Sequence, residues 1–126
     1  MVTDLEREPF SLKKRIRSFR FAGKGFLSLI KTEHNAWVHL TVAACVIAAG
    51  FIWHVSITEW CLLALCIGSV ISAEAFNSAL ESLADKVSVA YDPLIGKAKD
   101  MAAFAVLMLS LTAVCVGLLI FLPKII

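Results

Sequence analysis

Residues 60–83 read WCLLALCIGSVISAEAFNSALESL, the sequence of a helix that could cross a membrane. It is apolar through most of its length, and its two ionisable side chains, Glu74 and Glu81, appear only toward its end. A helix needs about 20 such residues to cross roughly 30 Å of hydrocarbon. Because a charged group inside a membrane helix is energetically expensive, Glu74 and Glu81 are by default functional residues.

Two further apolar segments, residues 37–55 and 102–122, are also long enough to span a membrane. Of the 126 residues, 60% are hydrophobic and 17% are charged, and the mean hydropathy is +0.84. Soluble domains contain roughly 25% charged residues, so this composition excludes an ordinary soluble domain. We expect an all-α membrane protein, a single domain over residues 1–126, with transmembrane helices at 36–55, 60–84 and 100–122.

Residues 10–31 precede the first span and mix basic with apolar side chains, a pattern typical of an amphipathic helix on a membrane surface. Gly23 and Gly25 are expected to weaken or bend this helix midway. Two interpretations remain open. The helix is either an anchor to anionic lipid alone, or an anchor that also forms one wall of an active site.

The distribution of basic residues predicts the orientation. The loop at residues 54–59 has none, and Glu59 within it is interpreted as a loop charge. The other flanks are basic: Arg7, Lys13, Lys14, Arg15, Arg17, Arg20, Lys24 and Lys31 precede the first span, and Lys86, Lys97 and Lys99 follow the second. The positive-inside rule therefore predicts a cytoplasmic N-terminus and second loop, with the C-terminus outside.

Polar residues of the second span form one stripe. The offsets of 3, 7 and 11 residues from Glu74 place four side chains within about 80° of one helix face: Glu74, Asn77, Glu81 and Asp85. With a rise of about 1.5 Å per residue, the two glutamates lie toward the cytoplasmic face. Glu33 before the first span, and Lys99 and Asp100 at the start of the third, are expected at the same membrane level.

This set of side chains suits phosphoryl transfer. Carboxylates hold Mg²⁺, a lysine contacts polyphosphate, and a further carboxylate accepts the proton of an alcohol. The sequence has no Walker A motif, and we expect no nucleic-acid partner. The three histidines, His34, His39 and His54, show no ligand spacing and are interpreted as interfacial or interhelical polar groups.

The motifs EAFNSALE at 74–81, Asp85 and KAKDMAA at 97–103 resemble the signature of the prokaryotic diacylglycerol kinase and undecaprenol kinase family. The resemblance covers residues 18–122 and includes Glu33 at the expected distance before the stripe. It implies a homotrimer of three-span subunits in the bacterial inner membrane, with active sites shared between neighbouring subunits at the cytoplasmic interface.

The resemblance also implies residue roles. Glu33 and Glu81 would bind the Mg²⁺ that accompanies ATP, and Glu74 would be the catalytic base toward the lipid hydroxyl. The nucleotide site would include the remaining polar residues: Asn77, Asp85, Lys99 and Asp100. One departure is Asp92, which stands after Tyr91 where many relatives have histidine.

The lipid substrate differs between two branches of the family. The stretches SFRFAGKG at 18–25, KTEHN at 31–35, VHL at 38–40 and EWC at 59–61 look more like the undecaprenol kinases. Undecaprenol is therefore the expected substrate, and diacylglycerol is the alternative.

Two non-enzymatic interpretations compete with a kinase. A small oligomeric transporter or channel would use Glu74 and Glu81 as cation or proton sites, but it predicts polar positions across the whole bilayer. The outer halves of all three spans are instead almost wholly apolar. A structural membrane subunit would not need the converging charged residues.

Overall fold

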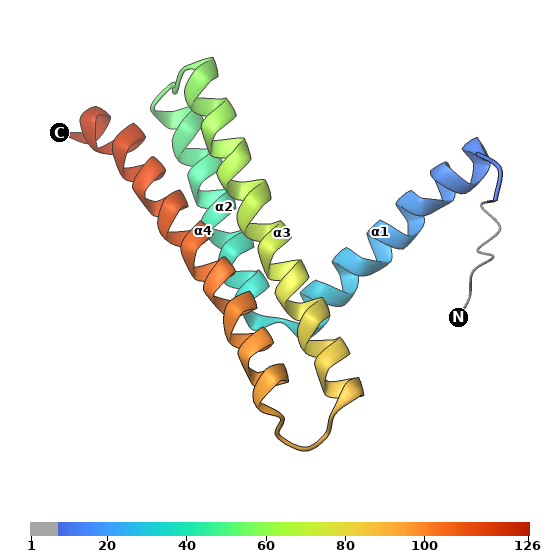
Figure 1. Ribbon diagram of the computed structural model, residues 1–126. Coiled ribbons are helices and arrows are strands. Elements are labelled where there is room, and N and C mark those ends of the chain that lie inside the picture. The colour runs from blue at the N-terminus through green and yellow to red at the C-terminus, as the bar shows by residue number, and fades with distance from the viewer. Residues whose placement is uncertain (1–7) are drawn as a thin grey trace.

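The computed structural model describes residues 8–126, which form four helices and the connections between them. The helices are α1 (Leu12–Thr32), α2 (His34–Ile52), α3 (Ile57–Val87) and α4 (Pro93–Ile125). Arg7 and the other residues of the predicted domain before residue 8 lie outside the described part. Figure 1 shows α2, α3 and α4 running side by side, while α1 projects sideways from the bundle near the end at which α3 and α4 are connected.

Three of the helices, α2, α3 and α4, are long and apolar enough to cross a membrane. Many of their large side chains face outward, as expected where lipid replaces water: Leu65, Phe76, Phe104, Leu107, Leu111 and Leu119 are all more than half exposed. The prediction of an all-α membrane protein with three spans after an N-terminal helix is therefore confirmed. The protein is a multi-pass membrane protein.

Polar caps fix where the helices begin. The Ser56 hydroxyl accepts a hydrogen bond from the Glu59 backbone N–H, and the Glu59 carboxylate accepts one from the Ser56 backbone N–H. Asp92 accepts from the backbone N–H groups of Leu94 and Ile95, directly before Pro93. Each arrangement satisfies N–H groups that a helix start leaves free, so Asp92 has a structural role as the cap of α4.

One sequence-based expectation is wrong. Glu59 is not a loop charge, because it lies in the first turn of α3 and its carboxylate also pairs with Lys124 at 3.1 Å. α1 is continuous through Gly23 and Gly25, so these two glycines do not interrupt the helix.

A buried hydrophobic cluster lies at the end of the bundle opposite the α3–α4 connection. Val55, Leu63 and Ile120 are buried there, surrounded by Val46, Trp60, Val116 and Phe121. The Trp60 ring packs against Phe51 at a tilt of 53°, with centroids 4.9 Å apart, and lies directly over Gly50, where a Cβ would clash with the indole. This apolar end holds the three spans together and leaves the other end for polar groups.

A single residue connects α1 to the bundle. Glu33 is extended (φ −115°, ψ 112°) and ends α1 while it begins α2. Trp37 reaches back from α2 and donates a hydrogen bond from Nε1 to the Ile30 carbonyl at 2.7 Å. The junction is thereby fastened on both sides of Glu33.

Candidate active site

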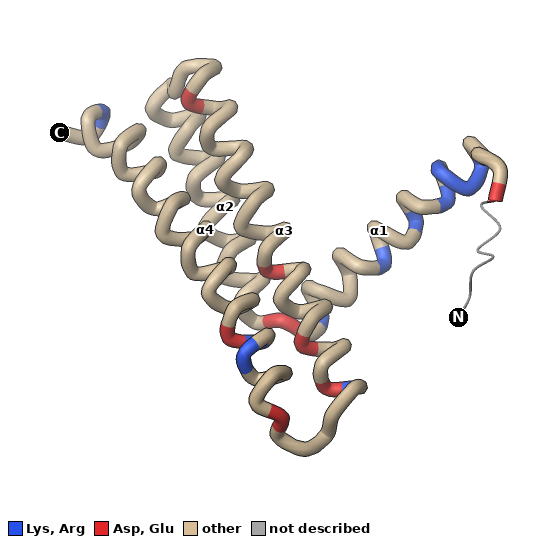
Figure 2. The backbone as a smooth tube through the Cα atoms, in the orientation of Figure 1, with Lys and Arg blue, Asp and Glu red and all other residues tan. Residues whose placement is uncertain are grey.

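Acidic residues gather at the end of the bundle where α1 joins α2 and where α3 turns into α4 (Figure 2). The most deeply placed is Glu74, which is only 1% exposed. Both of its carboxylate oxygens and Oδ1 of Asn77 are buried without a hydrogen-bond partner among the described residues. Buried polar atoms normally have partners, so these three atoms are free to accept hydrogen bonds from a ligand or from another chain.

One side chain from α2 approaches Glu74. Nε2 of His39 lies 3.5 Å from Oε2 of Glu74, which is ion-pair distance but longer than an ordinary hydrogen bond. Glu33 and Glu81 lie close enough for their charges to act on Glu74 as well. The structure therefore brings the three predicted glutamates into one electrostatic neighbourhood.

Glu33 is held in place from α3. The Ser78 hydroxyl donates a hydrogen bond to Oε1 of Glu33 at 2.8 Å, while the Glu33 backbone N–H donates to the Leu29 carbonyl at 3.0 Å. The carboxylate caps neither helix by itself. Its second oxygen stays available to a ligand, because the Ser78 hydroxyl engages only one of the two.

A lysine from α4 borders the same neighbourhood. Nζ of Lys99 lies 2.8 Å from Oδ1 of Asp85, joining the ends of α3 and α4, and the charge of Glu81 also acts on Lys99. Asp100, the next residue, is exposed, and no hydrogen bond or ion pair connects it to the other site residues within residues 8–126. Of the predicted nucleotide residues, Lys99 and Asp85 are thus paired, whereas Asp100 stands apart.

The donor set fits a hard cation. Glu33 and Glu81 offer carboxylate oxygens, which Mg²⁺ prefers. The described residues contain no cluster of three or more His, Cys, Asp or Glu side chains arranged to hold a metal by themselves. Mg²⁺ commonly uses one or two carboxylates together with substrate phosphates, so two glutamates agree with a metal that arrives with a nucleotide.

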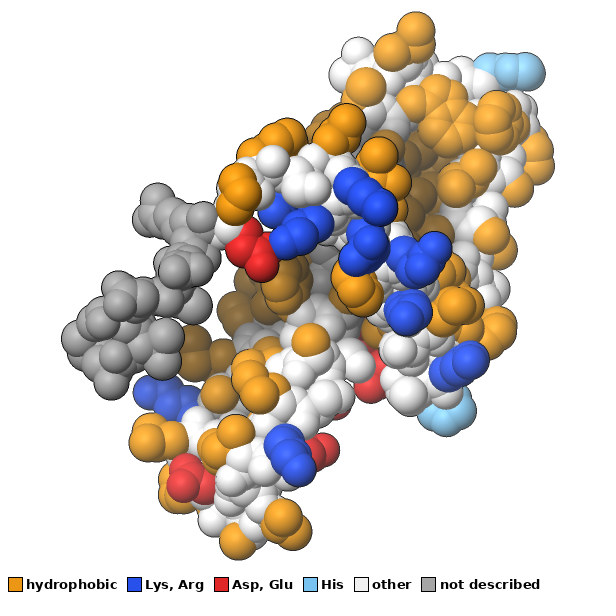
Figure 3. Space-filling view, turned by 90° about the vertical axis from the view of Figure 1, so that its right-hand side faces the viewer, with side chains coloured by type: hydrophobic (Ala, Val, Ile, Leu, Met, Phe, Trp, Pro, Cys, Tyr) orange, Lys and Arg blue, Asp and Glu red, His pale blue; other side chains and the backbone are white. Residues whose placement is uncertain are grey.

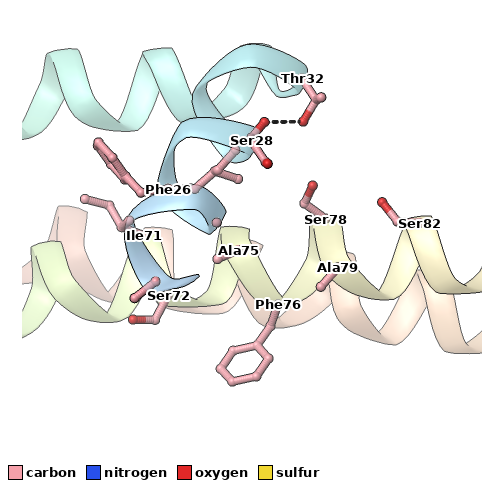
Figure 4. A pocket seen from close by; sticks show the side chains of 13 residues that line it. Phe26, Ser28, Thr32, Ile71, Ser72, Ala75, Phe76, Ser78, Ala79 and Ser82 are labelled. Carbon is pink, nitrogen blue, oxygen red and sulfur yellow. Dashed lines mark hydrogen bonds between the residues drawn. The ribbon is translucent and has the colours of Figure 1, made fainter. Parts of the chain in front are cut away.

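A cleft of about 660 Å³ opens between α1 and α3 beside these residues. Its walls are mostly small or apolar and include Gly25, Leu29, Ile71, Ala75 and Ala79. In Figure 4, the Ser78 and Ser82 side chains point from α3 toward the α1 side, and Phe76 points away. The partner of Glu33 therefore lies at the wall of an apolar cleft, a setting suited to a lipid with a polar end.

Two residues of this site were not predicted. His39 was interpreted only as an interfacial or interhelical polar group, and Ser78 was not singled out. Both contact a predicted glutamate across two helices. The sequence does contain a signal for His39. The first and second spans run in opposite directions, and Glu33 and Glu81 are expected at the same membrane level. His39 lies six residues beyond Glu33, about 9 Å deeper, and Glu74 lies seven residues before Glu81, about 10 Å deeper, so the two side chains are expected at similar depth.

The structure thus has three helices long enough to span a membrane, with carboxylates and a lysine at one end. A family model described as prokaryotic diacylglycerol kinase matches residues 20–121. The chain belongs to the prokaryotic diacylglycerol kinase family and is a lipid kinase. The resemblance based on residues 74–103 is thereby confirmed.

The similar proteins are named for two different lipid substrates, undecaprenol and diacylglycerol. The undecaprenol kinase of Bacillus subtilis (strain 168) is 39% identical over 113 residues, covering 90% of this chain and 92% of that protein. A diacylglycerol kinase of Synechocystis is 37% identical over 107 residues, covering 84% of this chain and 61% of that protein. A diacylglycerol kinase of Helicobacter pylori (strain J99) is 34% identical over 95 residues, 73% of each chain.

Proposed function

We propose that this lipid kinase transfers the terminal phosphate of ATP to the hydroxyl of undecaprenol, giving undecaprenyl phosphate. The single observation that carries this proposal is the buried carboxylate of Glu74, whose two oxygens have no hydrogen-bond partner among the described residues. A membrane alcohol needs a base at membrane depth, and Glu74 lies within a spanning helix. The similarity to the Bacillus subtilis undecaprenol kinase supports this choice of lipid.

The roles of the side chains follow from their chemistry. Glu74 takes the proton of the lipid hydroxyl, and Asn77, one helical turn away, orients the reacting groups. Lys99 contacts the ATP phosphates and is positioned by Asp85, with Asp100 at the edge of the nucleotide site. Glu33 and Glu81 would hold Mg²⁺, which neutralises phosphate charge and orients the phosphates when bound.

α1 forms one wall of this site in our proposal. The cleft beside Glu33 is bounded by α1 on one side and α3 on the other, which favours the interpretation that the helix does more than anchor the protein. Figure 3 shows Lys and Arg side chains gathered in a band on the face turned to the viewer. Basic side chains next to apolar ones suit a helix lying on an anionic inner leaflet, where it would cover the lipid substrate.

The assembly is also part of the proposal. We place the whole chain, residues 1–126, in one domain, with the N-terminus and the α3–α4 connection in the bacterial cytoplasm and the C-terminus outside. A single subunit buries little of α4, whose only buried residue is Ile120 among those described. Extensive exposed surface and the unpartnered atoms at Glu74 and Asn77 are consistent with a homotrimer in which a neighbour completes the site.

Diacylglycerol is the second candidate substrate. It is favoured by the names of the Synechocystis and Helicobacter pylori relatives. The chemistry at Glu74 would be the same, because both lipids present a hydroxyl near the membrane surface. The difference lies in the apolar part that the protein must accommodate.

A direct assay separates these substrates. Purified protein is incubated with labelled ATP and magnesium in bilayers that contain undecaprenol or diacylglycerol at equal mole fraction. We expect kcat/KM to be higher for undecaprenol. A higher value for diacylglycerol would reverse the assignment, and a lack of product with either lipid would contradict both.

Variants test the roles of the glutamates. Glu74→Gln should reduce turnover by about 10²-fold or more, because it removes a general base. Glu33→Gln and Glu81→Gln should raise the magnesium concentration needed for half-maximal activity. Wild-type turnover in Glu74→Gln, or unchanged magnesium curves in the other two variants, would remove the corresponding assignment.

A further inference from the structure

His39 makes a contact that the proposed roles do not use. Its Nε2 lies 3.5 Å from Oε2 of Glu74, and the imidazole is 20% exposed whereas the Glu74 side chain is 2% exposed. The histidine thus lies between a fully buried carboxylate and more open surroundings. Neither the Mg²⁺ residues nor the nucleotide residues require a group at this place.

The charged side chains around Glu74 explain what the contact with His39 could do. The charges that act on Glu74 within the described part of the chain belong to His39 on α2, Glu33 at the α1–α2 junction and Glu81 on α3. Two of these three neighbours are carboxylates and repel a negative charge on Glu74. Of these three side chains, only His39 can itself carry a positive charge, and Mg²⁺ held by Glu33 and Glu81 would add a second one when bound.

The other side of His39 contains no competing charge among the residues that border it. His39 lines a groove of about 500 Å³ with residues of α2, α3 and α4, including Cys66 and Ser110. Apart from His39, the residues that line this groove include no Asp, Glu, Lys or Arg. A positive charge on His39 is therefore directed mainly to Glu74.

We propose that His39 is a positioning residue for Glu74: its imidazole orients the carboxylate toward the lipid hydroxyl and, when it carries a positive charge, holds that carboxylate ionised. This inference rests on the proposed role of Glu74 as the base. His39 acts through Glu74 rather than on the reacting atoms. A separation of 3.5 Å is compatible with this role, because hydrogen bonds in catalytic sites often tighten only when substrate is bound.

The pH dependence of catalysis reveals such a residue. A carboxylate acts as a base only when it is ionised, and without the positive charge of His39 it becomes ionised at higher pH. The acid limb of the kcat profile should therefore move to higher pH in His39→Gln, by about one pH unit for an opposite charge at this distance. The KM values for lipid and ATP should change little, because His39 binds neither.

The profile is measured on the full-length protein in phosphatidylcholine bilayers with undecaprenol as acceptor. His54→Gln is the matched control, because His54 lies in the α2–α3 connection at the opposite end of the bundle. We expect this control to keep the wild-type profile. Glutamine at position 39 can still donate a hydrogen bond but cannot carry the charge, so it separates electrostatics from packing.

Infrared spectra give a readout that needs no turnover. A protonated carboxylic acid has a distinct C=O stretch, and the band of Glu74 is identified by its loss in Glu74→Gln. In His39→Gln this band should persist to higher pH than in the wild type. Should His39→Gln fail to fold, as judged by circular dichroism, His39→Asn takes its place.

The outcomes distinguish the inference from the function on which it rests. An unchanged infrared midpoint in the His39 variant would overturn the inference, whatever the activity. A shifted midpoint together with wild-type turnover in Glu74→Gln would overturn the base assignment and the catalytic part of the inference, while the pairing of the two side chains would stand. A shift in both the band and the acid limb supports the whole proposal.

Discussion

Ser78 and Glu33 are 45 residues apart in the sequence, and the hydroxyl of one donates a 2.8 Å hydrogen bond to the carboxylate of the other. This bond connects α3, at the residue next to Asn77, to the residue at which α1 meets α2. It fixes the position of a carboxylate that we assign to Mg²⁺. The first prediction concerns this bond.

Ser78→Ala should weaken the response to magnesium. Without the hydroxyl, Glu33 loses the contact that orients it, so the magnesium concentration for half-maximal activity should rise severalfold, and stability should fall by about 1 kcal/mol. Ser82→Ala is the control, because Ser82 lines the same cleft one helical turn further along α3 without a hydrogen bond to Glu33. A magnesium titration of lipid phosphorylation with identical curves for the two variants would contradict the prediction.

Lys99→Met should raise the KM for ATP by about tenfold or more, because it removes a charge-assisted contact to phosphate. The matched control is Lys97→Met, a change of the same size on the exposed surface two residues earlier in α4. Initial rates over a range of ATP concentrations give both constants. Equal KM values in the two variants would show that Lys99 serves only its ion pair with Asp85.

Asp85→Asn should have a smaller effect of the same kind. The Asp85 side chain is 71% exposed, so water screens its pair with Lys99 and the pair contributes little to stability. Asp85 instead holds the Lys99 side chain toward the site. We therefore expect Asp85→Asn to raise the KM for ATP severalfold and to leave kcat nearly unchanged. A lower KM would mean that Asp85 competes with the phosphates for Lys99.

Substitutions at the end of the bundle opposite the site should lower stability without changing catalysis. Ser56→Ala removes the hydroxyl that caps α3, which should cost about 1 kcal/mol. Thermal unfolding in detergent measures this loss, and the KM for ATP and the magnesium curve should match those of the wild type. Changed magnesium or ATP constants in this variant would indicate coupling between the two ends.

Gly50→Ala should lower the stability of the protein, although it adds only one methyl group. The added Cβ would clash with the indole of Trp60, so either the ring or the two helices must shift. We expect a loss of about 1–3 kcal/mol, the usual range for overpacking. Gly68→Ala, in α3 with nothing near its Cβ position, is the control and should be neutral or stabilising.

Much of the fold could be predicted because it depends on local rules. Three apolar stretches of sufficient length can satisfy their backbone groups in lipid only as helices, and the structure has three such helices. The stripe at Glu74, Asn77 and Glu81 follows from helical periodicity alone. The substrate, the assembly and the roles of the side chains stay predictions.

The contacts between helices could not be predicted in the same way. His39 and Ser78 meet glutamates on other elements only because the helices have particular rotations about their axes. Packing of side chains such as Trp60 against Phe51 fixes those rotations, and no short sequence pattern encodes them. Glu59 was misinterpreted for a simpler reason, since the capping box begins α3 before its apolar run starts.

α1 leaves the bundle as a long arm whose direction is set at one junction. With 21 residues, it extends about 30 Å from Glu33. At that length, a change of about 10° in its direction would displace its far end by about 5 Å. The hydrogen bonds from Trp37 to Ile30 and from Ser78 to Glu33 fix the direction at the junction, so two short contacts determine where the basic residues at the far end of α1 lie.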